Sequence, residues 1–177
     1  MRPVEHRLIL MRHAEALPPP GGDYSRETDL ARPLSADGMK TARRRGAKLR
    51  ADRISPDLVL CSPAMRTRQT YAALLPFAVH DAEIRIEQTL YNADAMELLA
   101  RLRASPDSAH TVLLVAHNPG ITELAQLLNG VETSLREEFL PATLATFRVE
   151  VDDFDSVARG WKNLGPRTSW LESFSQL

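Results

Sequence analysis

A chain of 177 residues is long enough to bury a sizeable core and fits a single domain over residues 1–177. With 44% hydrophobic residues, 25% charged residues and a formal net charge of −1, it lacks the basic excess typical of nucleic-acid binders. Its one cysteine, Cys61, excludes an intrachain disulfide and fits a reducing compartment. No apolar run approaches the roughly 18 residues of a membrane span, and the N-terminus does not fit a signal peptide. We therefore expect a cytoplasmic protein with no membrane or nucleic-acid partner.

The first half of the chain is predicted to contain two strands and two helices. Residues 7–11 form a short apolar run flanked by charge, which indicates a buried strand. Residues 17–34 are rich in proline and glycine and are predicted to be a loop. A helix should follow Ser35 as its N-cap, and then a second buried strand over 57–62 and a helix over 64–75.

The second half continues the alternation. Residues 82–87 are predicted to form a short edge strand, residues 95–104 an amphipathic helix and residues 111–117 a third buried strand. A helix should follow over 118–130. Residues 143–151 alternate in polarity, which predicts a final strand that is more exposed on one face.

The ends of these last elements carry further signals. Asn118 is a plausible cap for the helix after the third strand, with Pro119 in its first turn and Gly130 just past its end. The tail from Asp152, which includes Trp170, is expected to close the sheet. Apolar strands that alternate with helices predict an α/β three-layer sandwich, with a mostly parallel central sheet and helices on both faces.

Polar side chains follow three of the predicted strands. Arg12 and His13 come after the first strand, Arg66 after the second, and His117 and Asn118 after the third. Because ligands bind beyond the carboxyl ends of strands in such sheets, these groups are candidates for one site. Two arginines suit the oxygens of a phosphate dianion, and their charge should keep a nearby histidine neutral and nucleophilic. The helix that opens at Asn118 would add backbone N–H groups and a positive dipole end.

Each of these residues also has an ordinary structural interpretation. Arg66 lies in the run "RTRQT", where it or Arg68 could be a solvated helix residue, and the two cannot point the same way. His117 could be a hydrogen-bonded histidine at a strand end, and the "SP" before Arg66 is also a helix-cap signal. Cys61 fits a core position better than a nucleophile.

A metal site is a further alternative, for which His13, His117 and Asp29 are the candidate ligands. No pair of them has the close spacing of a helical zinc motif, and two nearby arginines would repel a cation. We therefore expect neither a metal nor another cofactor. The remaining histidines lie in polar surroundings, and we assign no role to them: His6, His80 and His110.

Four segments together resemble a known family. The runs "LMRHAEA", "DLARPLSADGMKTA", "LCSPAMRTRQT" and "LLVAHNPGI" follow the order of motifs in the histidine phosphatase superfamily, also called phosphoglycerate mutase-like. The short bacterial phosphohistidine phosphatases of the SixA type are the best match. The resemblance covers roughly residues 7 to 130.

The resemblance implies a role for each matched residue. His13 would become phosphorylated, Arg12 and Arg66 would hold the phosphoryl oxygens, and His117 would donate to them in the transition state. Asn118 would either line the pocket or only cap its helix. Phosphoryl transfer mainly requires that the protein position the reacting groups and stabilise the developing charge. These arginines and histidines can therefore suffice without a metal.

The sequence departs from the superfamily at the general acid. Where many members carry Pro-Glu-Leu, the chain has residues 88–90, Gln-Thr-Leu. Glu87, Glu15 and Asp29 are the candidate substitutes. An alkyl ester needs its leaving alkoxide protonated, whereas a phosphorylated imidazole is a better leaving group. The missing glutamate therefore favours a nitrogen–phosphorus bond as the substrate.

The segment between Arg66 and His117 is too short for the lid helices of the superfamily's mutases and broad phosphatases. We therefore expect a metal-independent phosphatase with a phosphohistidine intermediate, acting on protein phosphohistidine, and we disfavour mutase activity. The alternatives are a small-molecule phosphomonoesterase, which needs one of the three acids above, and a non-catalytic domain that binds phosphate or a phosphoprotein. Residues 17–34 would form either a partner-binding rim or an ordinary connection.

Overall fold

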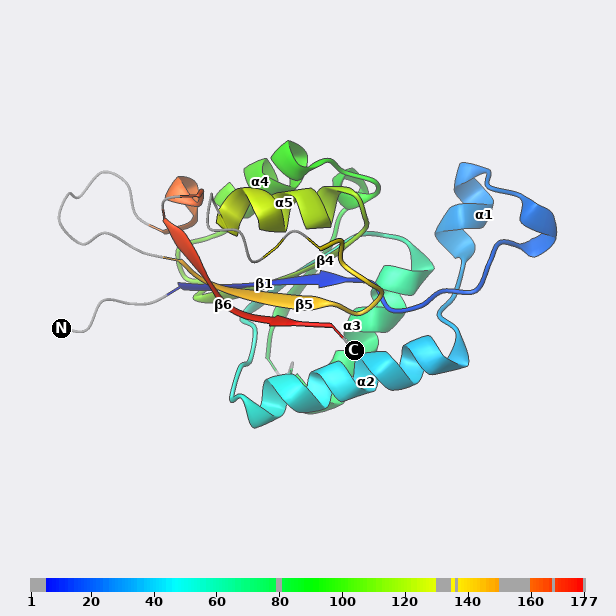
Figure 1. Ribbon diagram of the computed structural model, residues 1–177, viewed down its shortest axis with the longest axis horizontal. Helices are drawn as coiled ribbons and strands as arrows, with labels where there is room; N and C mark the ends of the chain where they lie inside the picture. Colours follow the sequence, from blue (N-terminus) through cyan, green and yellow to red (C-terminus); the bar gives the residue numbers. More distant parts are fainter. Residues whose placement is uncertain are drawn as a thin grey trace, which may run out of the picture.

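The computed structural model describes residues 6–78, 81–129, 135, 137–149, 160–166 and 168–176. Its strands are β1 (His6–Arg12), β2 (Leu58–Cys61), β3 (Glu83–Ile86), β4 (Thr111–Ala116), β5 (Leu144–Val149) and β6 (Ser169–Ser175). They form one sheet in the order β3-β2-β4-β1-β5-β6 (Figure 1). Strands β3, β2, β4 and β1 are parallel, and β5 and β6 are antiparallel to their neighbours.

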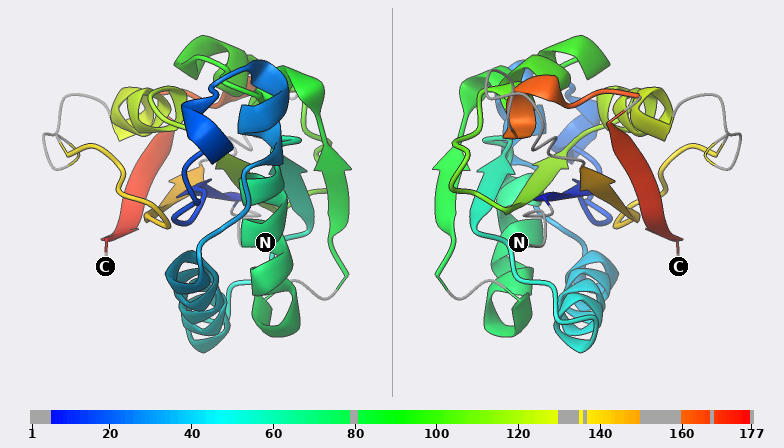
Figure 2. Two further views of the ribbon diagram at one scale, coloured as in Figure 1. Left: turned by 90° about the vertical axis from the view of Figure 1, so that its right-hand side faces the viewer. Right: turned by 90° about the vertical axis from the view of Figure 1, so that its left-hand side faces the viewer.

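Helices cover both faces of this sheet. The helices of the described residues are α1 (Arg26–Ala31), α2 (Ala36–Ala51), α3 (Met65–Ala78), α4 (Ala95–Arg103) and α5 (Gly120–Asn129), with 3-10 turns at Pro20–Gly22, Gln88–Leu90 and Gly160–Asn163. Seen along the sheet, α4 and α5 lie on one side and α2 and α3 on the other, whereas α1 lies beyond the ends to which the parallel strands point (Figures 1 and 2). The expected three-layer α/β sandwich is confirmed.

Strand β1 shows why the central strands are apolar throughout. Leu8 and Leu10 pack on one face, in the cluster that contains Leu98 of α4, and Ile9 and Met11 pack on the other face, against α2 and α3. All five side chains are 0% exposed. A strand covered on both faces has no position where a polar side chain would reach water.

The structure differs from the sequence predictions at β5. The strand predicted over residues 143–151 is confirmed as β5, but the expectations that it is the last strand and that one of its faces is more exposed were wrong. Strand β5 pairs with β1 on one side and β6 on the other, and within it only Arg148 is exposed. The tail does close the sheet as expected, because Trp170 lies in the edge strand β6.

The predicted loop over 17–34 was incomplete, because it contains α1. Ser25 caps this helix by accepting a hydrogen bond from the Thr28 N–H at 3.4 Å. The remaining predicted elements match the observed ones to within a few residues. His80 and Gly130 lie outside the described residues. In the part of the chain that is described, no helix combines the length and the apolar character needed to cross a bilayer.

Candidate active site

The sheet order brings the predicted site residues together. Strands β2, β4 and β1 are neighbours, and Arg12 at the end of β1 pairs with Ala116 at the end of β4, directly before His117. Arg66 comes from the first turn of α3, just after β2. The rings of His13 and His117 lie 5.3 Å apart between centroids, and Arg66 Nη2 lies 3.3 Å from His117 Nδ1. The strand ends and the helix turn that carry these residues lie at the end of the sheet nearest α1 (Figure 1).

His13 has a defined tautomer. Its Nδ1 lies 2.7 Å from the Ala14 carbonyl oxygen, which can only accept, so Nδ1 carries the proton and Nε2 has a free lone pair. Burial, against the raising effect of the Ala14 hydrogen bond and together with the charges of Arg66, Arg12 and Arg32, lowers the pKa of His13 to about 3. The imidazole is therefore neutral at physiological pH, the form that a nucleophile requires.

His117 is held in the other tautomer, with its proton on Nε2. The Arg66 guanidinium has donors only, so His117 Nδ1 accepts from it, and Nε2 carries the proton and donates to the Ser62 hydroxyl at 2.6 Å. Burial, followed by the charges of His13 and Arg66, lowers the pKa of His117 to about 2. A dianion bound in front of Nδ1 would oppose these effects and favour its protonation.

Arg66 is held by Asp29 of α1. It is 4% exposed, and it donates from Nη1 to the Asp29 carbonyl at 2.6 Å and from Nη2 to the Asp29 carboxylate at 2.9 Å. Two further donors reach the same carboxylate, Arg32 Nη1 at 2.9 Å and the Tyr91 hydroxyl at 2.7 Å. Helix α1 therefore orients the arginine that contacts His117.

Arg12 sits against the segment that precedes β5. Its Nη1 donates to the Phe139 carbonyl at 2.6 Å, and its Nε is buried with no acceptor among the described residues. Burial lowers the pKa of Arg12, with Glu138 opposing the shift and Arg66 adding to it. The guanidinium keeps its charge, because its pKa starts far above neutrality. Arg12 therefore has N–H groups that could donate hydrogen bonds to a bound anion.

The structure shows what Asn118 contacts. Its Nδ2 donates to the Glu138 carboxylate at 2.8 Å and to the Phe139 carbonyl at 2.9 Å, and its Oδ1 accepts from the Thr122 hydroxyl. Asn118 thus ties the start of α5 to the segment that holds Arg12.

The three candidate acids have different surroundings. Glu87 is committed to an ion pair with Arg101 of α4, and the side chain of Glu15 is exposed. Burial would raise the pKa of the Asp29 carboxyl, but the hydrogen bonds from Tyr91, Arg32 and Arg66 outweigh it and lower the pKa to about 2. Asp29 is in the site, but as an ionised acceptor. No group of histidine, cysteine, aspartate and glutamate side chains in the described ranges could hold a metal ion.

Four residues near the site were missed in the sequence. Arg32 and Tyr91 share Asp29, Ser62 fixes His117, and Thr70 accepts from the Ala14 N–H at 3.0 Å. The Tyr91 ring also lies edge-on to the His117 ring, 5.6 Å between centroids. Arg32, Ser62 and Thr70 belong to the quoted motifs, which was an available signal, whereas the position of Tyr91 follows from tertiary packing alone.

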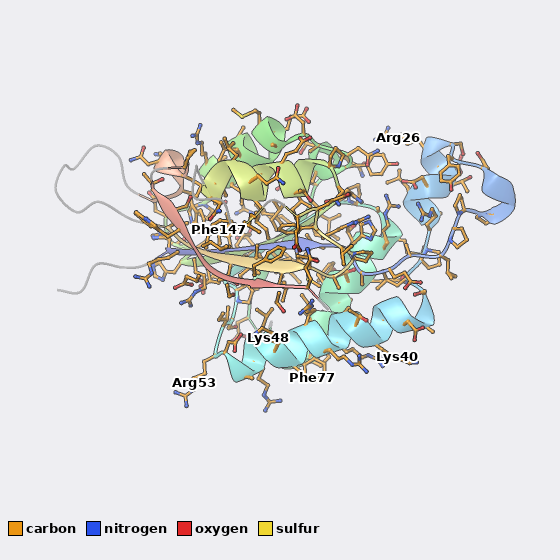
Figure 3. All side chains as sticks on the ribbon, in the orientation of Figure 1. Arg26, Lys40, Lys48, Arg53, Phe77 and Phe147 are labelled. Atoms are coloured by element: carbon orange, nitrogen blue, oxygen red, sulfur yellow. The ribbon has the colours of Figure 1, made fainter. Side chains whose placement is uncertain are left out.

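Tyr91 contacts both α1 and His117. Figure 3 shows Arg26 on α1 at this end of the molecule, and its Cζ lies 5.6 Å from the centre of the Tyr91 ring. A cation over an aromatic face is attractive, so this contact helps to keep α1 against the site.

A mixed α/β sheet with arginines and neutral histidines at its carboxyl edge is typical of proteins that handle phosphoryl groups. The sequence profile of the histidine phosphatase superfamily (branch 1) matches residues 8–98, and the chain belongs to this superfamily. The uncharacterized protein Rv1276c of Mycobacterium tuberculosis is 30% identical over 171 residues, which cover 93% of this chain and 98% of that protein.

Among the solved structures that are similar over nearly the whole chain are proteins from Nakamurella multipartitia and Agrobacterium tumefaciens. The protein from Nakamurella multipartitia, provisionally named phosphohistidine phosphatase SixA, is 30% identical, with a TM-score of 0.78 and coverage of 97% of this chain and 96% of that one. The protein from Agrobacterium tumefaciens with the same provisional name is 26% identical, with a TM-score of 0.78 and coverage of 97% and 98%.

Proposed function

We propose that the chain is a metal-independent phosphatase that removes phosphate from protein phosphohistidine through a covalent intermediate on His13. The observation that carries this proposal is the state of His13: a neutral imidazole whose Nδ1–H is bound to Ala14, with Nε2 free beside His117. A histidine so held, between two arginines, is suited to attack phosphorus.

In the first step, the lone pair of His13 Nε2 forms a bond to phosphorus while the bond from phosphorus to the substrate's ring nitrogen breaks. The leaving imidazole departs neutral, because the substrate ring already carries the proton it needs. Arg12 and Arg66 hold the phosphoryl oxygens. The bound dianion favours protonation of His117 Nδ1, and His117 then donates to these oxygens as charge shifts. In the second step, water attacks phosphorus and the His13 nitrogen leaves, which releases inorganic phosphate.

The surroundings of the carboxyl groups support a nitrogen–phosphorus substrate. Glu87 is paired with Arg101, and Asp29 is ionised, so neither is poised to protonate an alkoxide. The provisional names of the relatives from Nakamurella and Agrobacterium point to the same substrate class. A role in signal transduction, a phosphoprotein partner and a cytoplasmic location belong to this proposal.

The test is hydrolysis by the purified protein, with EDTA present, of a phosphohistidine-bearing protein beside a panel of phosphate esters. We expect turnover of the phosphohistidine, little turnover of alkyl esters, and loss of activity in His13→Ala. Efficient ester turnover would instead support the phosphomonoesterase alternative, with the acid still to be found. Phosphate binding without any turnover would overturn the proposal in favour of a binding domain.

A further inference from the structure

Three consecutive arginines on α2 differ in their surroundings. Arg43 and Arg44 are exposed, whereas Arg45 is 3% exposed. A buried guanidinium is costly unless its donors are satisfied. Arg45 donates from Nε to the Ala142 carbonyl at 2.7 Å, from Nη1 to the Ser175 hydroxyl at 2.7 Å and from Nη2 to the Ser175 carbonyl at 3.0 Å. Its hydrogen bonds thus join α2 to the end of β6 and to the turn before β5.

That turn, residues 139–143, forms hydrogen bonds with Arg12, the last residue of β1, and with His13, which follows it. The Phe139 carbonyl accepts from Arg12 Nη1 at 2.6 Å, and the Thr143 carbonyl accepts from the Arg12 N–H at 3.3 Å. The Ala142 N–H donates to the His13 carbonyl at 3.1 Å. The turn therefore holds the Arg12 guanidinium and the backbone of both residues.

The conformation of this turn is not one that alanine prefers. Ala142 has a φ of 63°, in the left-handed region that favours glycine, and its side chain is fully buried. A strained residue keeps such a conformation only where its surroundings hold it. The two hydrogen bonds of the Ala142 peptide groups, from Arg45 to its carbonyl and from its N–H to His13, supply that restraint.

We propose that Arg45 is a positioning residue for phosphate capture, which acts through the 139–143 turn to hold Arg12 and His13 in place. Without its guanidinium, the buried Ala142 carbonyl loses its donor, so the turn relaxes. The Phe139 carbonyl then no longer orients Arg12. The inference rests on the proposed function only where turnover is measured, because phosphate binding can be measured without catalysis.

The experiment compares Arg45→Met with Arg44→Met, an exposed neighbour in the same run, by titration with inorganic phosphate. We expect Arg45→Met to bind phosphate about tenfold or more weakly, since an oriented charged hydrogen bond is lost, and Arg44→Met to bind like wild type. If Arg45→Met folds poorly, Arg45→Lys is the second variant. It keeps the charge but cannot form all three hydrogen bonds of the guanidinium, and we expect it to bind phosphate with intermediate affinity. Phosphate affinity equal to wild type in a folded Arg45 variant would overturn the inference.

A double-mutant cycle separates positioning from general stability. In an Arg12→Ala background, Arg45→Met should weaken phosphate binding little further, because the group through which it acts is gone. Additive losses would mean that Arg45 does not act through Arg12 and would overturn the inference.

Ser175→Ala removes only one hydrogen bond, on the β6 side of Arg45, so we expect lower thermal stability with phosphate affinity unchanged. Weaker phosphate binding in Arg45→Met but no turnover in wild type would reject the proposed function and keep this inference.

Discussion

Ser62 sets the direction in which His117 can donate a proton. Its hydroxyl is fully buried and takes the Nε2–H of His117, which leaves Nδ1 toward Arg66 and the phosphate position. In the sequence, the "SP" pair was also compatible with a simple helix cap. The arginines and histidines could be predicted because each follows a strand, but the partner that fixes the tautomer depends on side-chain packing across β2 and β4.

We expect Ser62→Ala to lower kcat by about tenfold or more, because His117 loses the acceptor that fixes its tautomer. The measurement is steady-state kinetics on a phosphohistidine protein, together with nitrogen NMR of the imidazole. Ser105→Ala is the matched control, since Ser105 is a buried serine whose hydroxyl has no hydrogen-bond partner among the described residues. Unchanged kcat and an unchanged tautomer in Ser62→Ala would contradict this role.

Close backbone contacts between elements position the ends of the strands. The start of α5 approaches the loop before α4 so closely that a Cβ on Gly120 would lie 2.0 Å from the Ala93 carbonyl oxygen. His117 lies just ahead of this contact. The glycine of the "HNPG" run was predicted only as part of a motif, and its role follows from the packing of α5 on that loop.

We expect Gly120→Ala to destabilise the protein by about 1–3 kcal/mol and to reduce activity, because α5 and the strand end before it must shift. Urea unfolding and phosphohistidine turnover measure the two effects. Gly165→Ala should have little effect on either, since its Cβ would meet its nearest neighbour, Arg103, at 3.6 Å. Wild-type stability in Gly120→Ala would contradict this prediction, because it would show that the loop before α4 can move to make room for the methyl group without loss of free energy of unfolding.

Helix α1 was not predicted from the sequence. The composition of residues 17–34 indicates a loop, and a six-residue helix between prolines leaves little periodicity to detect. Its place depends on Asp29, whose contacts with Arg66 and Tyr91 are long-range. Glu87 illustrates the same point, because its pairing with Arg101 depends on where α4 packs.

For the whole molecule, two neutral histidines, the buried His117 and the partly buried His13, make folding depend on pH. The pKa values of His13 and His117 in the folded protein, about 3 and about 2, lie below the ordinary value of 6.5. The unfolded chain therefore binds more protons below pH 6.5, and the stability that is fully present above this pH is lost as the pH falls toward 3. Asp29, with its pKa of about 2, adds a smaller loss below its ordinary value of 3.8.

Between pH 6 and pH 4, each of the two histidines should lower the free energy of unfolding by up to about 1.4 kcal/mol per pH unit. Urea titrations at several pH values measure the slope for wild type and for His117→Gln. We expect a shallower slope in the variant, because one of the two groups no longer takes up a proton on unfolding. Equal slopes would mean that His117 is not held neutral in the folded state.

The architecture was largely predictable, because alternation of apolar strands and helices specifies a covered parallel sheet. The sequence predicted that the tail closes the sheet, but it could not reveal that the tail does so as a strand paired with β5, since that pairing joins segments separated along the chain. It also could not show that Arg45, one of three similar residues, is the buried one. Both features depend on tertiary contacts that leave no local pattern.

The most direct test of the proposed mechanism is to trap the phosphorylated protein. The purified chain is mixed with a phosphohistidine-bearing protein, quenched within milliseconds to seconds under alkaline conditions, and mapped by mass spectrometry. We predict a phosphoryl group on His13, shown by phosphorus NMR to be bound at Nε2, and no label or turnover in His13→Ala. A label on another residue, or turnover that persists in His13→Ala, would contradict this mechanism.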